Sequence, residues 1–99
     1  MNKISGIYLI TNKVNNKQYI GQSVNIYYRW KQYKYNYKTG NSLLYKDMQQ
    51  YGFENFEFKI IEKCHVSLLN EKEKYYIEKY NTLIPNGYNQ NKGGHGYTY

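Results

Sequence analysis

The chain has few of the features that mark secreted or membrane proteins. Its single cysteine, Cys64, cannot form an internal disulfide bond and is typical of a reducing compartment. It has no run of about eighteen apolar residues, so no segment is expected to span a membrane. The N-terminus lacks the basic, apolar and small-residue layout of a signal peptide. These absences favour an intracellular, cytoplasmic protein.

Acidic residues are also scarce, and this bears on the kind of partner. The 99 residues include seven Asp and Glu against fourteen Lys and Arg, which gives a net charge of +7. A small domain this basic often binds a polyanion, and its fifteen tyrosines supply rings that stack on bases or pack a core. A nucleotide-biased genome would also raise the lysine and tyrosine content, so composition alone leaves both interpretations open.

The length predicts a single domain over residues 1–99, and hydrophobic periodicity predicts that it is α/β. We expect a small, mostly antiparallel sheet of three strands, at 4–11, 18–22 and from 56 to about 60, flanked by helices. The expected helices run from a cap at Ser23 or Asn25 to about Lys38, from a cap at Ser42 to Gly52, and from a cap at Ser67 to about Tyr80. The glycine-rich segment 93–99 is expected to be mobile.

The first two predicted strands form a hairpin with Asn15 and Asn16 in its turn. If these two residues are the whole loop, Tyr19 stands opposite Asn12. Any register in which paired residue numbers have an odd sum places Tyr8 and Tyr19 on the same face of the sheet. The two tyrosines are therefore expected to be neighbours.

Two charged residues interrupt the apolar stripes of predicted helices, Arg29 in the first and Glu73 in the last. A carboxylate on an inward face is costly unless it is paired or binds a metal. An arginine presents a fork of donors that matches a phosphate. Two structural alternatives stay open from the pattern: an ion pair between Arg29 and Glu73, and an arginine that extends over Trp30.

Three lysines gather on a different face of the first predicted helix: Lys31, Lys34 and Lys38. Their spacing places them side by side, away from the apolar stripe. We expect this face to contact the phosphates of DNA.

Short motifs recur in a fixed order along residues 6–94. They are Gly6-Ile7-Tyr8, Tyr19-Ile20-Gly21, Arg29 with Tyr33 one turn later, Glu73, and Gly87-Tyr88-Asn89 followed by Gly93-Gly94. One such tripeptide alone would mean little. Together, in this order and within a module of this length, they resemble the GIY-YIG nucleases.

The resemblance implies a metal-dependent phosphodiesterase that acts on DNA, with Mg²⁺ or Mn²⁺ as the expected ion. Only one inward carboxylate is evident, where a two-metal site would need several, so one metal is expected. By this resemblance Glu73 is the metal ligand, Arg29 neutralises charge on the scissile phosphate, and Tyr8 and Tyr19 line the active site. Tyr8 is implied to help deprotonate the attacking water, and Asn89 to position a neighbouring tyrosine or the phosphate. An asparagine that caps its own turn is the alternative for Asn89.

The chain departs from some relatives in its histidines. Tyr33 stands where some family members carry a histidine, and the region around Asn41 also lacks one. His65 and His95 fall on no motif position. Proton transfer is therefore expected to run through Tyr8 together with Tyr33, with Arg29 and a metal lowering the pKa of Tyr8. Cys64 is expected to be a buried thiol.

A different class of function also fits the composition, namely a basic module that binds nucleic acid without cutting it. The intact motif positions favour the nuclease. One active site cuts one strand, so cleavage of both strands would require a dimer or successive nicks. Relatives of this kind usually add a separate recognition domain, and none is expected within residues 1–99. The sequence does not identify the target.

Overall fold

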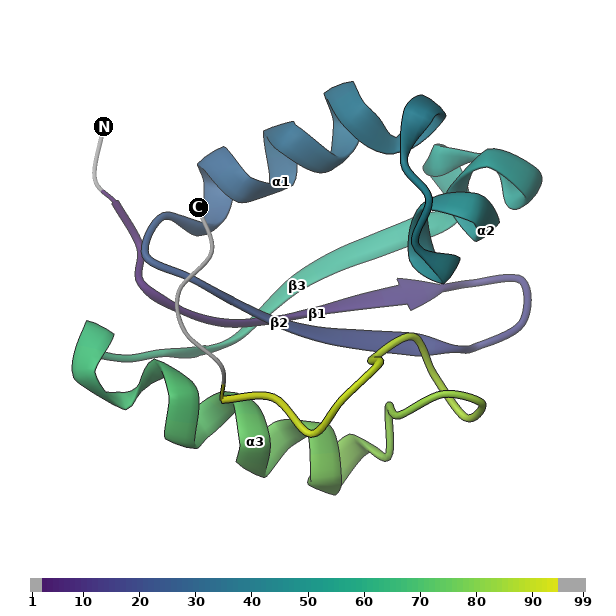
Figure 1. Cartoon of the computed structure of the whole chain (residues 1–99). Helices are drawn as coiled ribbons and strands as arrows, with labels where there is room; N and C mark the ends of the chain where they lie inside the picture. Colours follow the sequence, from purple (N-terminus) through teal and green to yellow (C-terminus); the bar gives the residue numbers. More distant parts are fainter. Residues whose placement is uncertain (1–2, 95–99) are drawn as a thin grey trace.

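The computed structural model describes residues 3–94, shown as the coloured part of the ribbon in Figure 1. His95 and the greater part of the predicted mobile segment 93–99 lie outside the described residues. Within the described range no helix has the length and apolar character that a bilayer crossing requires.

The core of the architecture is an antiparallel sheet of three strands in the order β2-β1-β3. Strand β1 spans Gly6–Asn12, β2 Gln18–Ser23 and β3 Phe56–Lys63. The main helices are α1 over Ile26–Asn36, α2 over Leu43–Tyr51 and α3 over Leu69–Tyr80. Figure 1 shows α1 and α2 on one side of the sheet and α3 on the other. The predicted fold class is confirmed.

Alternation along β1 supplies a separate apolar core to each face of the sheet. Tyr8 and Ile10 join the cluster under α1 and α2, whereas Ile7 and Leu9 join the cluster against α3. Successive strand residues point to opposite faces, so one strand contributes to both cores. The central strand is consequently buried along nearly its whole length.

The hairpin register differs from the two-residue loop predicted from the sequence. Tyr19 pairs with Ile10 rather than Asn12, and a four-residue loop at 13–16 is closed by a hydrogen bond from Asn12 N to Lys17 O of 2.9 Å. Asn16 takes the left-handed conformation, with φ of 65°. The paired numbers still have an odd sum, so Tyr8 and Tyr19 share a face, and their ring centroids lie 6.5 Å apart.

The first helix is shorter than predicted, while both of its proposed capping residues take part in its start. Asn25 is the N-cap, and its Oδ1 accepts a hydrogen bond from Tyr28 N; Ser23 Oγ accepts from Asn25 N. The α-helix ends at Asn36, and Lys38 lies in a short 3₁₀ turn that follows it.

The other helix boundaries were predicted with mixed success. The Ser42 cap of α2 is confirmed, and Gly52 ends that helix with φ of 92°. The Ser67 cap is wrong, because a 3₁₀ turn at Val66–Leu68 precedes α3 and His65 Nδ1 accepts from Ser67 N to cap that turn instead. Strand β3 also runs further than predicted, because Gly6 and Ile7 of β1 pair with its last residues.

Cys64 follows the end of β3 and is only half-buried, so the predicted buried thiol is wrong. Its side chain packs at the margin of the α3 core. Burial raises the pKa of the Cys64 thiol, and the nearby Glu62 carboxylate adds to this. A thiol with a raised pKa is a weak nucleophile, which is consistent with a packing role.

Candidate functional site

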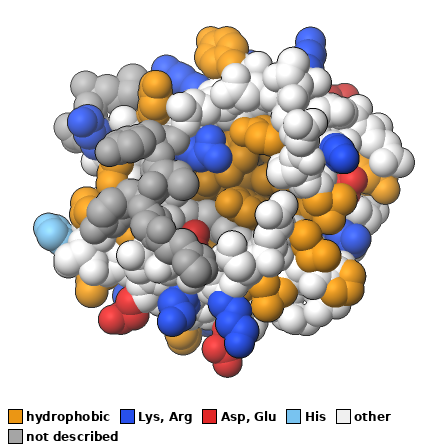
Figure 2. All heavy atoms as spheres, viewed as in Figure 1, with side chains coloured by type: hydrophobic (Ala, Val, Ile, Leu, Met, Phe, Trp, Pro, Cys, Tyr) orange, Lys and Arg blue, Asp and Glu red, His pale blue; other side chains and the backbone are white. Residues whose placement is uncertain are grey.

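A cleft of about 390 Å³ opens where the two layers of helices meet at β2. Figure 2 shows the hollow, with apolar side chains on its floor and a basic side chain at its rim. Five of the six predicted catalytic residues line it: Tyr19, Arg29, Tyr33, Glu73 and Asn89. Residues far apart in the sequence therefore converge on one site. The sixth, Tyr8, is not among the lining residues.

Tyr8 lies behind the cleft wall and reaches the site through Tyr33. It is 1% exposed, and its hydroxyl forms a 2.8 Å hydrogen bond with the Tyr33 hydroxyl. Gly21 stands opposite Tyr8 in the hairpin, and a Cβ there would overlap the Tyr8 ring. The glycine of the second motif therefore makes room for the tyrosine of the first. This contact gives a physical reason for the pairing of the two tripeptides.

Burial raises the pKa of Tyr8 and Tyr33 well above the ordinary value for a phenol, although the nearby Arg29 guanidinium opposes this. The neighbouring Tyr33 phenol, burial and the Glu73 carboxylate raise the pKa of Tyr19. Arg29 alone does not lower the Tyr8 pKa, because the desolvation of a phenolate outweighs its attraction, so the expected lowering would depend on the metal.

Arg29 projects from α1 into the cleft with most of its donors uncommitted. Its guanidinium lies over the Tyr33 ring, 4.3 Å from the centroid, and Nη1 donates a long bond of 3.4 Å to Gln32 Oε1. Nε is buried and has no hydrogen-bond partner among residues 3–94. Arg29 therefore stacks on Tyr33 rather than extending over Trp30. A guanidinium held in this way presents its remaining donors to a ligand.

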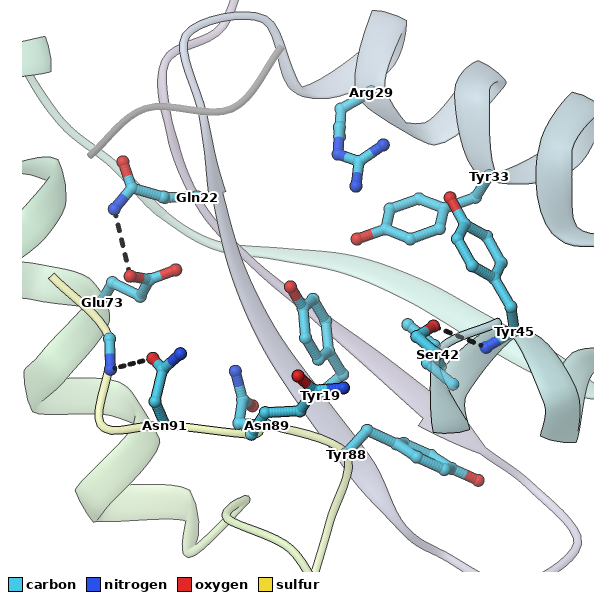
Figure 3. A pocket seen from close by; sticks show the side chains of 13 residues that line it. Tyr19, Gln22, Arg29, Tyr33, Ser42, Tyr45, Glu73, Tyr88, Asn89 and Asn91 are labelled. Atoms are coloured by element: carbon cyan, nitrogen blue, oxygen red, sulfur yellow. Dashed lines mark hydrogen bonds between the residues drawn. The ribbon is translucent and has the colours of Figure 1, made fainter. Parts of the chain in front are cut away.

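Glu73 projects from α3 on the opposite wall, and it does not pair with Arg29. Throughout the described part of the chain the only ion pair joins Lys72 to Glu62, at 3.3 Å. Instead, Glu73 Oε1 accepts hydrogen bonds from Gln22 Nε2 at 3.1 Å and from Gly94 N at 2.8 Å. Figure 3 shows the second carboxylate oxygen directed into the cleft. A half-buried carboxylate with one oxygen held and one open suits a cation ligand.

The donor set fits Mg²⁺ or Mn²⁺ with few protein ligands. These ions prefer oxygen donors, and Mg²⁺ keeps several of its waters when one carboxylate and substrate phosphates hold it. Among the described residues no three His, Cys, Asp or Glu side chains are placed to share a metal ion. Glu73 would therefore be the single carboxylate ligand, and the single metal ion stays a prediction.

Asn89 fastens the loop after α3 to the strand that carries Tyr19. Its Oδ1 accepts from Ile20 N at 2.9 Å and from Thr82 Oγ1 at 2.7 Å, and its Nδ2 donates to Ile20 O at 2.9 Å. The side chain thus bonds both backbone groups of Ile20. It holds the residue next to Tyr19 in place, and it is more than a cap of its own turn.

Two further parts of the site are not singled out by the motifs. Gln22 lines the cleft and contacts Glu73, and its signal is a polar residue at an inward strand position, two residues after buried Ile20. Tyr45 lines the opposite side and packs on Tyr33 at 5.7 Å between centroids. No local pattern marks Tyr45, because its place depends on how α2 folds back against α1.

The predicted DNA-binding lysines lie outside the cleft. Lys31 and Lys34 are exposed on α1, and Lys38 is exposed on the 3₁₀ turn that extends it. They follow Arg29 by two, five and nine positions, so helical periodicity places them on the side of the helix away from Arg29 and the cleft.

Comparisons with known proteins agree on one family. Residues 4–89 match the family model described as the GIY-YIG catalytic domain. The chain is 34% identical over 90 residues to intron-associated endonuclease 1 of Enterobacteria phage T4, and 35% identical over 83 residues to probable intron-encoded endonuclease 1 of Neurospora crassa. These matches cover 86% and 77% of this chain but 36% and 27% of the two relatives. The chain therefore spans about a third of the length of the curated relatives it matches.

Solved structures give the same result. A mutant of the catalytic domain of intron endonuclease I-TevI superposes with a TM-score of 0.82 at 32% identity, covering 91% of this chain and 96% of that one. A second structure, of the catalytic domain of the homing endonuclease I-TevI, gives a TM-score of 0.77 at 33% identity, covering 88% and 98%.

Proposed function

The chain belongs to the GIY-YIG catalytic-domain family, and from this membership we propose that it hydrolyses phosphodiester bonds of DNA. The observation that carries the proposal is the convergence of Arg29 and Glu73 on one cleft without an ion pair between them. The two residues line the same cleft from opposite walls. Here each faces the space between them, where a phosphate and its counter-ion would fit.

Arg29 binds the scissile phosphate in this proposal. The donors of its guanidinium that face the cleft match phosphate oxygens, and stacking on Tyr33 fixes the plane of the fork. As water attacks phosphorus in line, negative charge grows on the phosphate oxygens, and a preorganised guanidinium stabilises that charge. The bond from phosphorus to the leaving oxygen then breaks.

The phenols orient the attacking water. Tyr19 and Tyr33 line the cleft, and Tyr8 fixes the direction of the Tyr33 hydroxyl from behind. Because burial raises the pKa of Tyr8 and Tyr33, both are neutral near pH 7 and act first as hydrogen-bonding groups. A tyrosine hydroxyl that already donates to a neighbour accepts a hydrogen bond from water in a defined direction.

Glu73 would hold Mg²⁺ or Mn²⁺ through its open oxygen. The ion would supply charge neutralisation at the leaving oxygen. Its single carboxylate leaves coordination positions for water and for phosphate oxygens, so DNA itself would complete the site.

The distribution of charge supports DNA as the substrate. Residues 1–46 hold eight of the fourteen basic residues and none of the seven acidic ones. The exposed Lys31, Lys34 and Lys38 belong to this segment, as does Arg29. Basic side chains attract the phosphate backbone and do so without reading sequence. Recognition of a target, and cleavage of the second strand, would then need a dimer or a separate recognition domain.

The test is a nicking assay on supercoiled plasmid with and without Mg²⁺. We expect Glu73→Gln to abolish nicking, because glutamine keeps the volume but not the charge, while the melting temperature stays close to that of the wild type. Glu71→Gln, on the exposed face of the same helix, is the matched control and should cut normally. DNA binding without any Mg²⁺-dependent nicking by the wild type would instead identify a binding module. Nicking by Glu73→Gln near the wild-type rate would refute the role of Glu73.

A further inference from the structure

Gln22 directly follows the Tyr19-Ile20-Gly21 motif and is only 2% exposed. Ile20, two residues earlier on β2, packs in the apolar core against α3. Gln22 points the same way, because alternate strand residues share a face. A buried amide at such a position is costly unless its polar atoms are hydrogen-bonded. Its contacts therefore indicate what it does.

The Gln22 amide donates to two side chains of α3. Nε2 lies 2.8 Å from Asn70 Oδ1 and 3.1 Å from Glu73 Oε1. Asn70 and Glu73 are three residues apart, so they sit on one face of the helix. An amide nitrogen carries two hydrogens, and both acceptors are oxygens that can only accept. Rotating the amide by half a turn would place its own oxygen against them, so the orientation of Gln22 is fixed.

This arrangement fixes the carboxylate of Glu73 as well. Gly94 N donates to the same Oε1 at 2.8 Å, so two donors hold one carboxylate oxygen. Figure 3 shows the result, with Oε1 turned toward Gln22 and the other oxygen facing the cleft. Groups that hydrogen-bond a ligating carboxylate orient it and tune its affinity for the metal.

We propose that Gln22 is a positioning residue for the divalent cation: it holds Glu73 so that the open oxygen is presented to the ion. The inference rests on the proposed role of Glu73. It extends the functional unit of β2 by one residue beyond the motif, and it links the strand that carries Tyr19 to the helix that carries Glu73.

A purely structural role would give a different result. If Gln22 served only to tie β2 to α3, its loss would lower stability and leave the affinity for metal unchanged. Gln18 provides the matched control, because it lies on the same strand, its Nε2 donates to Thr11 Oγ1 at 3.0 Å, and it is outside the cleft lining. Methionine has the length of glutamine but no donor, so the same substitution can be made at both positions.

The experiment measures Mn²⁺ binding to the full chain by electron paramagnetic resonance, with thermal melts of each variant. We expect Gln22→Met to weaken Mn²⁺ binding by about 10-fold or more, the size typical of a lost partner of a metal ligand. Gln18→Met should stay within about two-fold of the wild type. In the nicking assay, Gln22→Met should need more Mg²⁺ for half-maximal rate and recover most of its rate when Mg²⁺ is saturating.

Glu73→Gln separates the two levels of the proposal. If it weakens Mn²⁺ binding and Gln22→Met binds like Gln18→Met, Gln22 has no positioning role and the role of Glu73 stands. If Glu73→Gln binds Mn²⁺ as tightly as the wild type, the cation site itself is wrong and the inference falls with it. If Gln22→Met does not fold, Asn70→Ala removes the second anchor of the amide, and unchanged Mn²⁺ affinity in that variant would overturn the proposal.

Discussion

The hydroxyl pair of Tyr8 and Tyr33 can be tested by a double-mutant cycle. Tyr8→Phe removes one hydroxyl and deprives the Tyr33 hydroxyl, in a side chain only 2% exposed, of its 2.8 Å partner. A buried polar group left without a partner costs about 1–3 kcal/mol. Tyr33→Phe should cost a similar amount for the same reason. The double variant removes both polar groups and keeps both rings, so it should be about as stable as either single variant.

Trp30 makes the measurement simple. It is the only tryptophan, and it packs edge-on against Tyr8 with centroids 6.1 Å apart. Its fluorescence in a urea titration therefore reports on this region of the core. The cycle should give a coupling energy of about 1–2 kcal/mol between the two sites. Strictly additive losses would refute a mutual hydrogen bond and leave two independent phenols.

The pH dependence of stability provides a second test of the Tyr8 and Tyr33 pair. Burial raises the pKa of Tyr8 and Tyr33 in the folded protein, so the unfolded chain loses these protons first, from about pH 10. Wild-type stability should therefore be complete below pH 10 and fall above it, by up to about 1.4 kcal/mol per pH unit for each such tyrosine. The double phenylalanine variant should fall less steeply. Equal slopes would show that burial does not hold the two phenols neutral.

Two other predictions concern the substrate surface and the loop after α3. The affinity for duplex DNA, measured by anisotropy with Ca²⁺ in place of Mg²⁺, should fall as salt rises, with a log–log slope of roughly −3 to −4. Changing Lys31, Lys34 and Lys38 to glutamine should make this slope shallower by about 3. The same change at Lys59, Lys63 and Lys79, which are also exposed, is the control; an equal effect would mean that α1 is not the contact face. Asn89→Ala removes three side-chain hydrogen bonds and should lower the free energy of unfolding by about 2–4 kcal/mol. The control is Asn91→Ala, which removes one hydrogen bond from Gly93 N and should lower it by about 0.5–1 kcal/mol. Equal losses in urea titrations would contradict the role of Asn89 in holding the loop to β2.

The parts of the site that follow from local rules could be predicted from the sequence. The alternation of side chains along a strand correctly predicted that Tyr8 and Tyr19 share a face, even though the predicted loop length was wrong. The sum of paired residue numbers changed by two and stayed odd, so each side chain kept its face. Helical periodicity placed Arg29 and Glu73 on inward faces, and both line the cleft. Such patterns depend on a few neighbouring residues and persist whatever the rest of the chain does.

The parts that depend on distant contacts could not be predicted. Nothing near Tyr8 in the sequence shows that Tyr33 separates it from the cleft, or that the resulting burial raises its pKa. The hydrogen bond from Gly94 N to Glu73 is a second case. Gly94 was expected to be mobile because it lies in a glycine-rich segment, yet its backbone N–H donates to the Glu73 carboxylate on α3. In both places the tertiary fold, rather than the local pattern, sets the environment of a group.

The bonds of Asn89 have a consequence for how this domain associates with other chains. Strand β2 is an edge of the sheet, and edge strands with free backbone groups recruit further strands and promote aggregation. Here Tyr88 N bonds Gln18 O, and the Asn89 amide bonds both backbone groups of Ile20, so a loop imitates the strand that would otherwise add. The edge that borders the cleft is thereby closed to strand addition at Gln18 and Ile20. A partner that meets this edge at these two residues must therefore dock by side chains.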